Sequence, residues 1–375
     1  MSGDACEAER AEFQAFVDAR IAPYAAEFDR DERVPSAVIE AMADAGYLGY
    51  TLPEAWGGRG KGAIAWGYLN EHVGRGCSSL RSLLTVHEMV AQALVHWGTE
   101  AARAEWLPRL ASGRTTAAFA LTESNSGSDA RAIEATADVI AGGYLLNGVK
   151  RWISFGQIAG VFLVFARCEG QPGAFLVERH SPGVTAAPLA GLLGLRASMA
   201  ADVHFRDCQV PESALVGRVG FGLSHVAGQA LNDGRYSVAW GCVGIAHACL
   251  TASMHHASQR RQSGEYLKDH QLVRRMLTEM IVNVRAARLL CLDAGRLKEA
   301  RDPKGVVQTS VAKYFSARAA AHAARDAVQI HGARGCAADA AVARHFRDAK
   351  VMEIIEGTDE IHQLTIAEHG FQRES

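Results

Sequence analysis

The sequence predicts an α+β protein in which a mainly antiparallel β-domain lies between two helical domains. Residues 1–115 and 221–375 are rich in alanine and place apolar residues at helical spacing. Residues 116–220 instead contain short apolar runs separated by turn residues. We therefore expect an N-terminal α-helical domain (1–115), a middle β-domain (116–220) and a C-terminal helical bundle domain (221–375).

Helical spacing is clearest at two places. In VHEMVAQALVHW the apolar residues fall near one stripe, at Val86, Met89, Val90, Leu94 and Trp97. In LVRRMLTEMIVNVRAARLLCLDAG (272–295) they recur with a period of 3.6, at Val273, Met276, Leu277, Met280, Ile281, Val284, Ala287 and Cys291. A second alanine-rich helix is expected over 308–330, and long helices with apolar stripes pack as a bundle.

The middle region carries the strand signals. The runs VFLVFARC, GAFLVER and ADVHFRDCQV are predicted to be short strands. Asn147-Gly148 in GGYLLNGVKRWIS lies between apolar runs, which predicts a hairpin turn. Strands joined by such turns form a compact, largely antiparallel sheet.

The composition is that of an ordinary globular protein, with 49% apolar and 21% charged residues and a formal net charge of −2. This balance gives no general attraction to nucleic acid or to a membrane surface. The first residues do not have the pattern of a signal peptide, and no apolar run approaches the length of a membrane span. Since the cysteines form no CxxC pair and the histidines no HExxH motif, we expect reduced thiols in a cytoplasmic protein and no metal site.

Three glycine-containing or aromatic stretches suit a ligand, but each also has an ordinary structural interpretation. AFALTESNSGSDA offers hydroxyls and backbone N–H groups to a phosphate, or is a simple turn. In KRWIS, Trp152 is either a core residue or stacks on a flat cofactor with the Ser154 hydroxyl at the ring edge. QIHGARG either caps a helix or brings its backbone close to a ligand.

The carboxylate of Glu356 stands between Ile354-Ile355 and Gly357 in KVMEIIEGTDEIHQL. The simplest interpretation is a helix that ends near Gly357 with Glu356 in solvent. The alternative is a functional acid. Two further carboxylates, Glu353 and Glu360, lie a helical turn away on either side.

Together, and in this order, these stretches resemble the acyl-CoA dehydrogenase family of flavoproteins. The family motifs TExxxGSD, WI(T/S), RxxFG, QxxGGxG and EGT are matched by Thr122-Glu123…Gly127-Ser128-Asp129, Trp152-Ile153-Ser154, Arg260…Gly264, Gln329…Gly332…Gly335 and Glu356-Gly357-Thr358. The resemblance covers about residues 10 to 370. It implies a C-terminal four-helix bundle, an FAD cofactor and an oxidoreductase that acts on an acyl thioester and passes electrons to a further acceptor.

The resemblance implies that Glu356 is the base that removes the α-proton of the thioester while a hydride passes from the β-carbon to flavin N5. Such a base must be close and desolvated, and apolar neighbours such as Ile354 and Ile355 raise the basicity of a carboxylate. Gly357 is implied to let the substrate carbonyl approach a backbone N–H, which stabilises the developing enolate charge. Glu353 and Glu360 are poorer candidates for the base.

The resemblance also implies the other site residues. The flavin and its phosphates are lined by Leu121, Thr122, Gly127 and Ser128, the isoalloxazine ring is covered by Trp152 and Ser154, and Thr358 and Glu360 also contact the cofactor, Glu360 near its adenine. Substrate contacts are implied at Ser128, Arg235, Trp240 and Gly357. Arg260 and Gln329 are implied to reach the pyrophosphate of a neighbouring subunit's FAD, so a complete site requires a homodimer or homotetramer.

Three positions depart from the family motifs. Ser263 stands in place of phenylalanine in RxxFG, Ala333 replaces the second glycine of QxxGG, and Ser154 replaces a common threonine while keeping the hydroxyl. These changes bear on flavin affinity and leave the reaction class unchanged.

Two further stretches, SLRSLLTVHEM and GRYSVAWGCVGI, resemble one branch of the family. In that branch the substrate is a short acyl group on an acyl carrier protein, used to make hydroxymalonyl or methoxymalonyl extender units for polyketide and peptide antibiotics. Trp240 would shorten the acyl cavity if it borders it, or it packs against another helix as core. The alternatives are a short-chain acyl-CoA dehydrogenase of catabolism, an acyl-CoA oxidase and a flavin-free scaffold relative.

Overall fold

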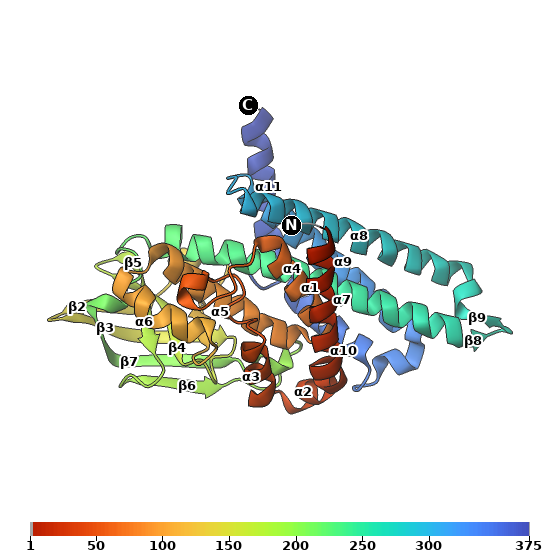
Figure 1. Ribbon diagram of the computed structural model, residues 1–375, viewed down its shortest axis with the longest axis horizontal. Helices are drawn as coiled ribbons and strands as arrows, with labels where there is room; N and C mark the ends of the chain where they lie inside the picture. Colours follow the sequence, from red (N-terminus) through yellow and green to blue (C-terminus); the bar gives the residue numbers. More distant parts are fainter. Residues whose placement is uncertain (1–2, 375) are drawn as a thin grey trace.

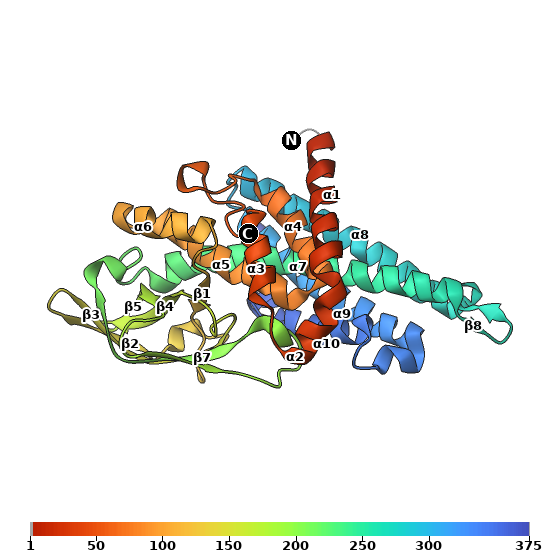
Figure 2. The same ribbon diagram turned by 60° about the horizontal axis from the view of Figure 1, so that its bottom comes forward.

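The computed structural model describes residues 3–374 and confirms the order of helices, strands and helices (Figure 1). The N-terminal helices are α1 (Gly3–Arg20), α2 (Ala25–Asp31), α3 (Ser36–Asp44), α4 (Ala63–Gly76), α5 (Ser78–Trp97) and α6 (Glu100–Ala111). Helix α5 contacts strand β1 on one side and the long helix α7 on the other, and Figure 2 shows it between the sheet and the bundle. Its residues are therefore buried all around the helix over 78–91, not on one stripe alone.

The middle region forms one seven-stranded sheet with the order β1-β4-β2-β3-β7-β6 and β5 paired to β4. Its strands are β1 (Ala117–Ala120), β2 (Thr136–Ile140), β3 (Gly143–Ile153), β4 (Val161–Cys168), β5 (Gln171–Glu178), β6 (Val184–Pro188) and β7 (Ala201–Pro211). The pairs β2–β3, β3–β7, β4–β5 and β6–β7 are antiparallel, whereas β1 runs parallel to β4. Strand β4 is buried on both faces, which explains its unbroken apolar run.

The predicted hairpin turn at Asn147-Gly148 was wrong. The turn between β2 and β3 is Ala141-Gly142, with a φ of 80° at Gly142, and Asn147-Gly148 lies inside β3. The register with β7 shifts between Leu146 and Gly148, and a Cβ on Gly148 would lie 2.6 Å from that of Ala135. This glycine therefore serves a bulge and a close approach of two chain segments.

The C-terminal helices are α7 (Gly228–Gln259), α8 (Gln271–Glu299), α9 (Gly305–His331), α10 (Ala341–Met352) and α11 (Asp359–Glu374), with a short hairpin of β8 (Arg261–Gln262) and β9 (Glu265–Tyr266) after α7. The two long helices predicted over 272–295 and 308–330 are present as α8 and α9. Helix α7 packs against α4, α5, α8 and α9 and forms the centre of the bundle. Figure 1 shows it running from the sheet at one end of the molecule to the β8–β9 hairpin at the other.

Helix α7 also corrects an expectation about membrane spans. Among the described residues, the helical segment Gly222–Gln259 is long and apolar enough to cross a membrane by length and composition, with a mean hydropathy of 1.3 in its most apolar window. However, 72% of that window is buried inside the protein. The apolar character is thus accounted for by the position of α7 at the centre of the bundle.

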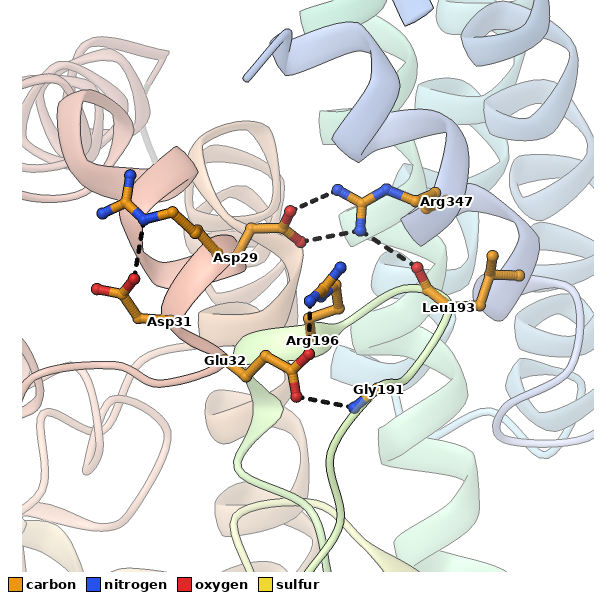
Figure 3. Close-up of polar contacts among 8 residues, drawn as sticks. Asp29, Asp31, Glu32, Gly191, Leu193, Arg196 and Arg347 are labelled. Carbon is orange, nitrogen blue, oxygen red and sulfur yellow. Dashed lines mark hydrogen bonds and ion pairs between the residues drawn. The ribbon is translucent and has the colours of Figure 1, made fainter. Parts of the chain in front are cut away.

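Three segments that are distant in the sequence meet beside α10 (Figure 3). Arg347 of α10 forms an ion pair with Asp29 of α2 and donates a hydrogen bond of 3.2 Å to the carbonyl of Leu193 in the β6–β7 loop. Just beyond α2, Glu32 pairs with Arg196 of the same loop at 2.5 Å. These contacts fix the orientation of α10, which leads directly to Glu356.

We expect Arg347→Ala to destabilise the protein by about 1–3 kcal/mol, because it removes charge-assisted bonds that are mostly shielded from water. Arg30→Ala is the matched control, since Arg30 pairs with its neighbour Asp31 and both side chains are more than half exposed. Its expected effect is below about 0.5 kcal/mol. Thermal unfolding of the two variants under identical conditions measures the difference, and equal midpoints would show that the α10 contact contributes little.

Candidate active site

Glu356 lies in the turn between α10 and α11 and points into the protein. Helix α10 ends at Met352, and the backbone at Glu356 and Gly357 has φ values of 55° and 99°. The carboxylate oxygen Oε2 is buried and has no hydrogen-bond partner among the residues that the structure describes. The interpretation of Glu356 as a solvent-exposed residue at a helix end is therefore wrong.

The groups that desolvate Glu356 come from other helices. A Cβ on Gly234 of α7 would lie 2.7 Å from Glu356 Oε2 and 2.8 Å from the sulfur of Met89 on α5, so the carboxylate and this sulfur both pack against Gly234. The neighbouring Ile354 is 52% exposed and contributes little. The carboxylate of Glu356 is desolvated as expected, but Ile354 does not contribute to this.

Two cations hold the backbone beside the carboxylate. Arg235 Nε donates to the carbonyl of Glu356 at 3.1 Å, and Lys313 Nζ donates to the carbonyl of Gly357 at 2.7 Å. Burial raises the pKa of Glu356 to about 7, while the positive charges of Arg235, Arg81 and Lys313 oppose this rise. A carboxylate with a pKa near neutrality is basic enough to remove a weakly acidic proton and is still partly ionised.

This pKa predicts the pH dependence of catalysis. Only the ionised form of Glu356 accepts a proton, so kcat/KM should rise with pH, level off above about 7, and fall about tenfold per pH unit well below it. Burial also raises the pKa of Glu88 to about 7. Glu88→Gln is therefore the control. A midpoint that stays in place in this variant assigns the titration to Glu356, and a midpoint that disappears assigns it to Glu88.

The loops after β1 and β3 bring the predicted flavin residues together. Arg151 N donates to the carbonyl of Thr122 at 2.8 Å, which places the end of β1 beside the end of β3. Trp152 is 54% exposed and lies where the register of β3 with β7 shifts, with a φ of 60°. The interpretation of Trp152 as a core residue is thus wrong, and its indole lies open beside the half-buried Ser154.

The loop from Leu121 to Ser128 is ordered by a buried ion pair. Lys150 Nζ lies 2.5 Å from Glu123 Oε1 and donates to the carbonyl of Leu121 at 3.1 Å. Glu123 also accepts bonds from the backbone N–H groups of Glu134 and Ala135. Gly127 and Ser128 are left exposed on this rigid base. An open indole beside an ordered polar loop fits one face and the polar edge of a flavin ring.

The two residues expected to contact a neighbour's cofactor lie elsewhere. Arg260, at the C-terminal end of α7, and Gln329, near the end of α9, are both exposed, and the rings of His256 and His331 stack between these helix ends. Helix α7 has 32 residues and thus spans about 48 Å. Figure 1 shows this end of the bundle far from the sheet. One chain therefore does not place all the predicted cofactor residues around a single FAD.

The remaining predicted residues lie near the base or in the core. Thr358 accepts a bond from Ile361 N at the start of α11, and Glu360 is exposed in its first turn. Trp240 of α7 is fully buried against α4, where it packs on Tyr68 with ring centroids 5.0 Å apart. The structure therefore supports its core interpretation, and a contact with the acyl group stays a prediction.

Two features of the site were not predicted. Lys313, which holds the carbonyl of Gly357, lies in an alanine-rich helix with nothing in the sequence to distinguish it. Arg81 lies fully buried on α5, and its charge acts on Glu356. The sequence offers one signal for Arg81, since a charged residue within the apolar stretch SLRSLLT is unusual. Within residues 3–374, no three His, Cys, Asp or Glu side chains gather in a way that could hold a metal ion.

Comparison with known protein families identifies the class of protein. The N-terminal, middle and C-terminal domains of acyl-CoA dehydrogenase match residues 4–114, 118–208 and 222–371. The chain therefore belongs to the acyl-CoA dehydrogenase family and is an oxidoreductase with FAD as its cofactor.

Two similar proteins are acyl-CoA dehydrogenases. The chain is 36% identical to an acyl-CoA dehydrogenase of Bacillus subtilis over 360 residues, covering 94% of each chain. It is 33% identical to the human mitochondrial short-chain specific acyl-CoA dehydrogenase, with 94% of this chain and 87% of the relative covered.

Three solved structures are similar over nearly their whole length. FkbI, for biosynthesis of the methoxymalonyl extender unit of the polyketide Fk520, has a TM-score of 0.89 and 33% identity, covering 97% of this chain and 99% of FkbI. The prolyl acyl carrier protein oxidase AnaB has a TM-score of 0.93 and 25% identity, covering 98% and 99%. A glutaryl-CoA dehydrogenase of Mycobacterium smegmatis in complex with FADH2 has a TM-score of 0.93 and 29% identity, covering 98% and 95%.

Proposed function

We propose that this protein oxidises a short acyl group carried on an acyl carrier protein, in the synthesis of a hydroxymalonyl- or methoxymalonyl-type extender unit. We further propose that Glu356 is its catalytic base. The observation that carries the assignment of the base is the buried Oε2 of Glu356, which has no hydrogen-bond partner among the described residues and packs against Gly234 beside Met89, with cations on its backbone side. The similarity to FkbI and AnaB supports the carrier protein and the pathway.

The chain's own residues account for the proton step. Glu356 Oε2 takes the α-proton, and the electron pair of the broken C–H bond forms the new α,β double bond. FAD, when bound, accepts the hydride that leaves the β-carbon. The N–H of Gly357 stabilises the charge on the thioester oxygen. Arg235 fixes that peptide through the Glu356 carbonyl, and Lys313 fixes the following peptide through the Gly357 carbonyl. Close packing by Gly234 and Met89 keeps water from the carboxylate.

We place FAD between two subunits. Leu121, Thr122, Gly127, Ser128, Trp152, Ser154, Thr358 and Glu360 of one chain would hold it, together with Arg260 and Gln329 of a neighbour. The exposed indole of Trp152 and the separation of the two groups along α7 support this arrangement. The substrate contacts are proposed at Ser128, Arg235 and Gly357. Ser128 also lines a surface pocket of about 550 Å³, formed with Arg131, Arg167, Leu223 and Ser224 among others.

Arg260→Ala should lower the retention of FAD, because it removes a charge-assisted contact to a phosphate. Arg30→Ala removes the same charge at an exposed site on α2 and should have no effect. The ratio of FAD to protein after gel filtration measures retention, and the same run gives the size of the particle. A monomer that keeps a full complement of FAD would contradict the shared site.

The role of Glu356 is tested by exchange of the α-proton. Incubated in heavy water with its thioester, the wild-type holoenzyme should incorporate deuterium at the α-carbon, as detected by mass spectrometry. Glu356→Gln should not. Exchange at the wild-type rate in this variant would move the base to another residue, with Glu353 and Glu360 the next to test.

A further inference from the structure

Helix α5 holds a buried arginine that the proton step does not require. Arg81 is fully buried on α5, and its hydrogen-bond partners among the described residues are neutral. Its Nη1 donates to Thr85 Oγ1 at 2.6 Å and to Ser237 Oγ of α7 at 3.2 Å. Within residues 3–374, no carboxylate forms an ion pair with it. A buried charge without a counter-ion is costly, so this arrangement calls for an explanation.

The hydrogen bonds around Arg81 run in one direction and leave one edge of the guanidinium free. Thr85 donates onward to Ser237 at 2.7 Å, and Ser237 donates to Asn70 Oδ1 at 2.6 Å. The two hydrogens of Nη1 are thus accepted. Nε is buried without a partner, and Nη2 meets only the sulfur of Met352 at 3.8 Å, which is a weak acceptor. The free Nε–Nη2 edge is one that holds a carboxylate by two parallel bonds.

Arg81 and Glu356 lie along the same face of α7. Gly234, Ser237 and Gly241 follow helical spacing, so they line one face. Gly234 packs on the Glu356 carboxylate, and a Cβ on Gly241 would lie 2.6 Å from Arg81 Nε. Gly234 and Gly241 are separated by about 10 Å along the axis. A short acyl chain with its α-carbon at Glu356 would therefore extend along this face toward Arg81.

The side chains at the two ends of this span are able to make room for a ligand. Met89 packs at Glu356, and Met352 packs at the free edge of Arg81. Methionine is unbranched and adopts several shapes at low cost. Thr85 and Ser237, in contrast, hold the guanidinium in place. The arrangement thus combines a fixed charge with movable apolar neighbours.

We propose that the Nε–Nη2 edge of Arg81 binds an anionic oxygen, such as that of a carboxylate, at the far end of the short acyl chain. This inference rests on the proposed function, because it takes Glu356 to mark the reacting carbon. A methyl group at the same place would leave the buried charge without a partner, so acyl chains that end in carbon are disfavoured. A neutral hydroxyl oxygen accepts a weaker hydrogen bond, so an acyl group that ends in a hydroxyl should bind more tightly than one ending in methyl and less tightly than one ending in carboxylate. Arg81 is then the residue that sets substrate specificity.

Equilibrium binding to the non-reacting Glu356→Gln holoenzyme tests this inference. Butyryl and succinyl groups, which differ only in a terminal methyl or carboxylate, are loaded on the same carrier, so that the carrier's contribution cancels. We expect the succinyl form to bind about 10- to 100-fold more tightly. The Arg81→Met change in this background should abolish the preference, and Arg81→Lys should keep part of it. No preference for succinyl without the Arg81 change, or a full preference that survives Arg81→Met, would overturn the inference.

Two readouts separate this inference from its alternatives. If Arg81 serves only as a counter-charge to Glu356, then Arg81→Met in the wild-type background shifts the pH midpoint of catalysis equally for all acyl groups, and the terminal group has no influence on binding. If the proposed function fails, α-proton exchange persists in Glu356→Gln whatever the terminal group. Thr85→Val, which loosens the guanidinium but keeps its charge, should weaken the succinyl preference without reversing it.

Discussion

Glu356→Gln is expected to lower turnover by about 10²–10⁴-fold while the protein keeps its fold and its FAD. Glutamine has nearly the shape of glutamate, so the packing against Gly234 and Met89 is preserved. The amide cannot accept the α-proton, so flavin reduction by substrate should almost stop. Rapid mixing of the holoenzyme with its acyl thioester measures this rate directly.

Glu353→Gln is the matched control for this experiment. Glu353 lies one turn earlier, where its carboxylate pairs with Lys350 at 2.9 Å at the surface of α10. Its loss should leave the rate of flavin reduction within a few-fold of the wild type. If the two variants behave alike, or if Glu353→Gln has the larger effect, Glu356 is not the base.

Lys150→Met is expected to destabilise the protein by about 3–5 kcal/mol, because it leaves the buried carboxylate of Glu123 without its counter-ion. Both side chains of this pair are almost completely buried. Since Glu123 and Lys150 together order the loop that carries Thr122 and Ser128, the variant should also retain less FAD. Thermal unfolding and the FAD-to-protein ratio give the two readouts.

The double variant Lys150→Met/Glu123→Gln identifies the cause of this loss. Removing both charges leaves no unpaired ion, so part of the stability should return, although the loop stays less ordered. If the double variant is as unstable as the sum of the two single changes, the charge pair is not the source of the effect. A wild-type melting temperature for Lys150→Met would contradict the account of this loop altogether.

The order of the elements could be predicted from local patterns, whereas one turn could not. Helices α8 and α9 have apolar residues with a clear period, and these recur whatever surrounds them. Asn147-Gly148 carries a strong local turn signal, yet the glycine is required by the approach of Ala135 from a distant segment. That contact is tertiary, so the local pattern misplaces the turn by six residues, at Asn147-Gly148 instead of Ala141-Gly142.

The same distinction holds at the active site. The motif around Glu356 predicts the residue and its inward carboxylate, but the groups that desolvate it, Gly234 and Met89, come from α7 and α5. Trp152 is ambiguous in the sequence because an indole suits a core as well as a ligand. In the structure it lies at a register shift of β3 with β7, and its side chain is exposed.

Arg81 was missed for a related reason. A single arginine in a helix normally faces water, and the apolar stripe of α5 predicts one buried face. Burial of α5 on all sides follows from its place between β1 and α7, which no local pattern shows. The missing counter-ion becomes visible only when every neighbour of the guanidinium is known.

The central claim is that the enzyme oxidises a short acyl group delivered by a carrier protein. Rapid mixing of the holoenzyme with a three-carbon acyl group on a carrier protein, the same group on CoA, and octanoyl-CoA tests it most directly, with the loss of flavin absorbance as the signal. The account predicts the fastest reduction with the carrier-bound short group and very slow reduction with octanoyl-CoA. Fast reduction by octanoyl-CoA, or equal rates for the carrier and CoA forms of the short group, would contradict it and favour a catabolic acyl-CoA dehydrogenase.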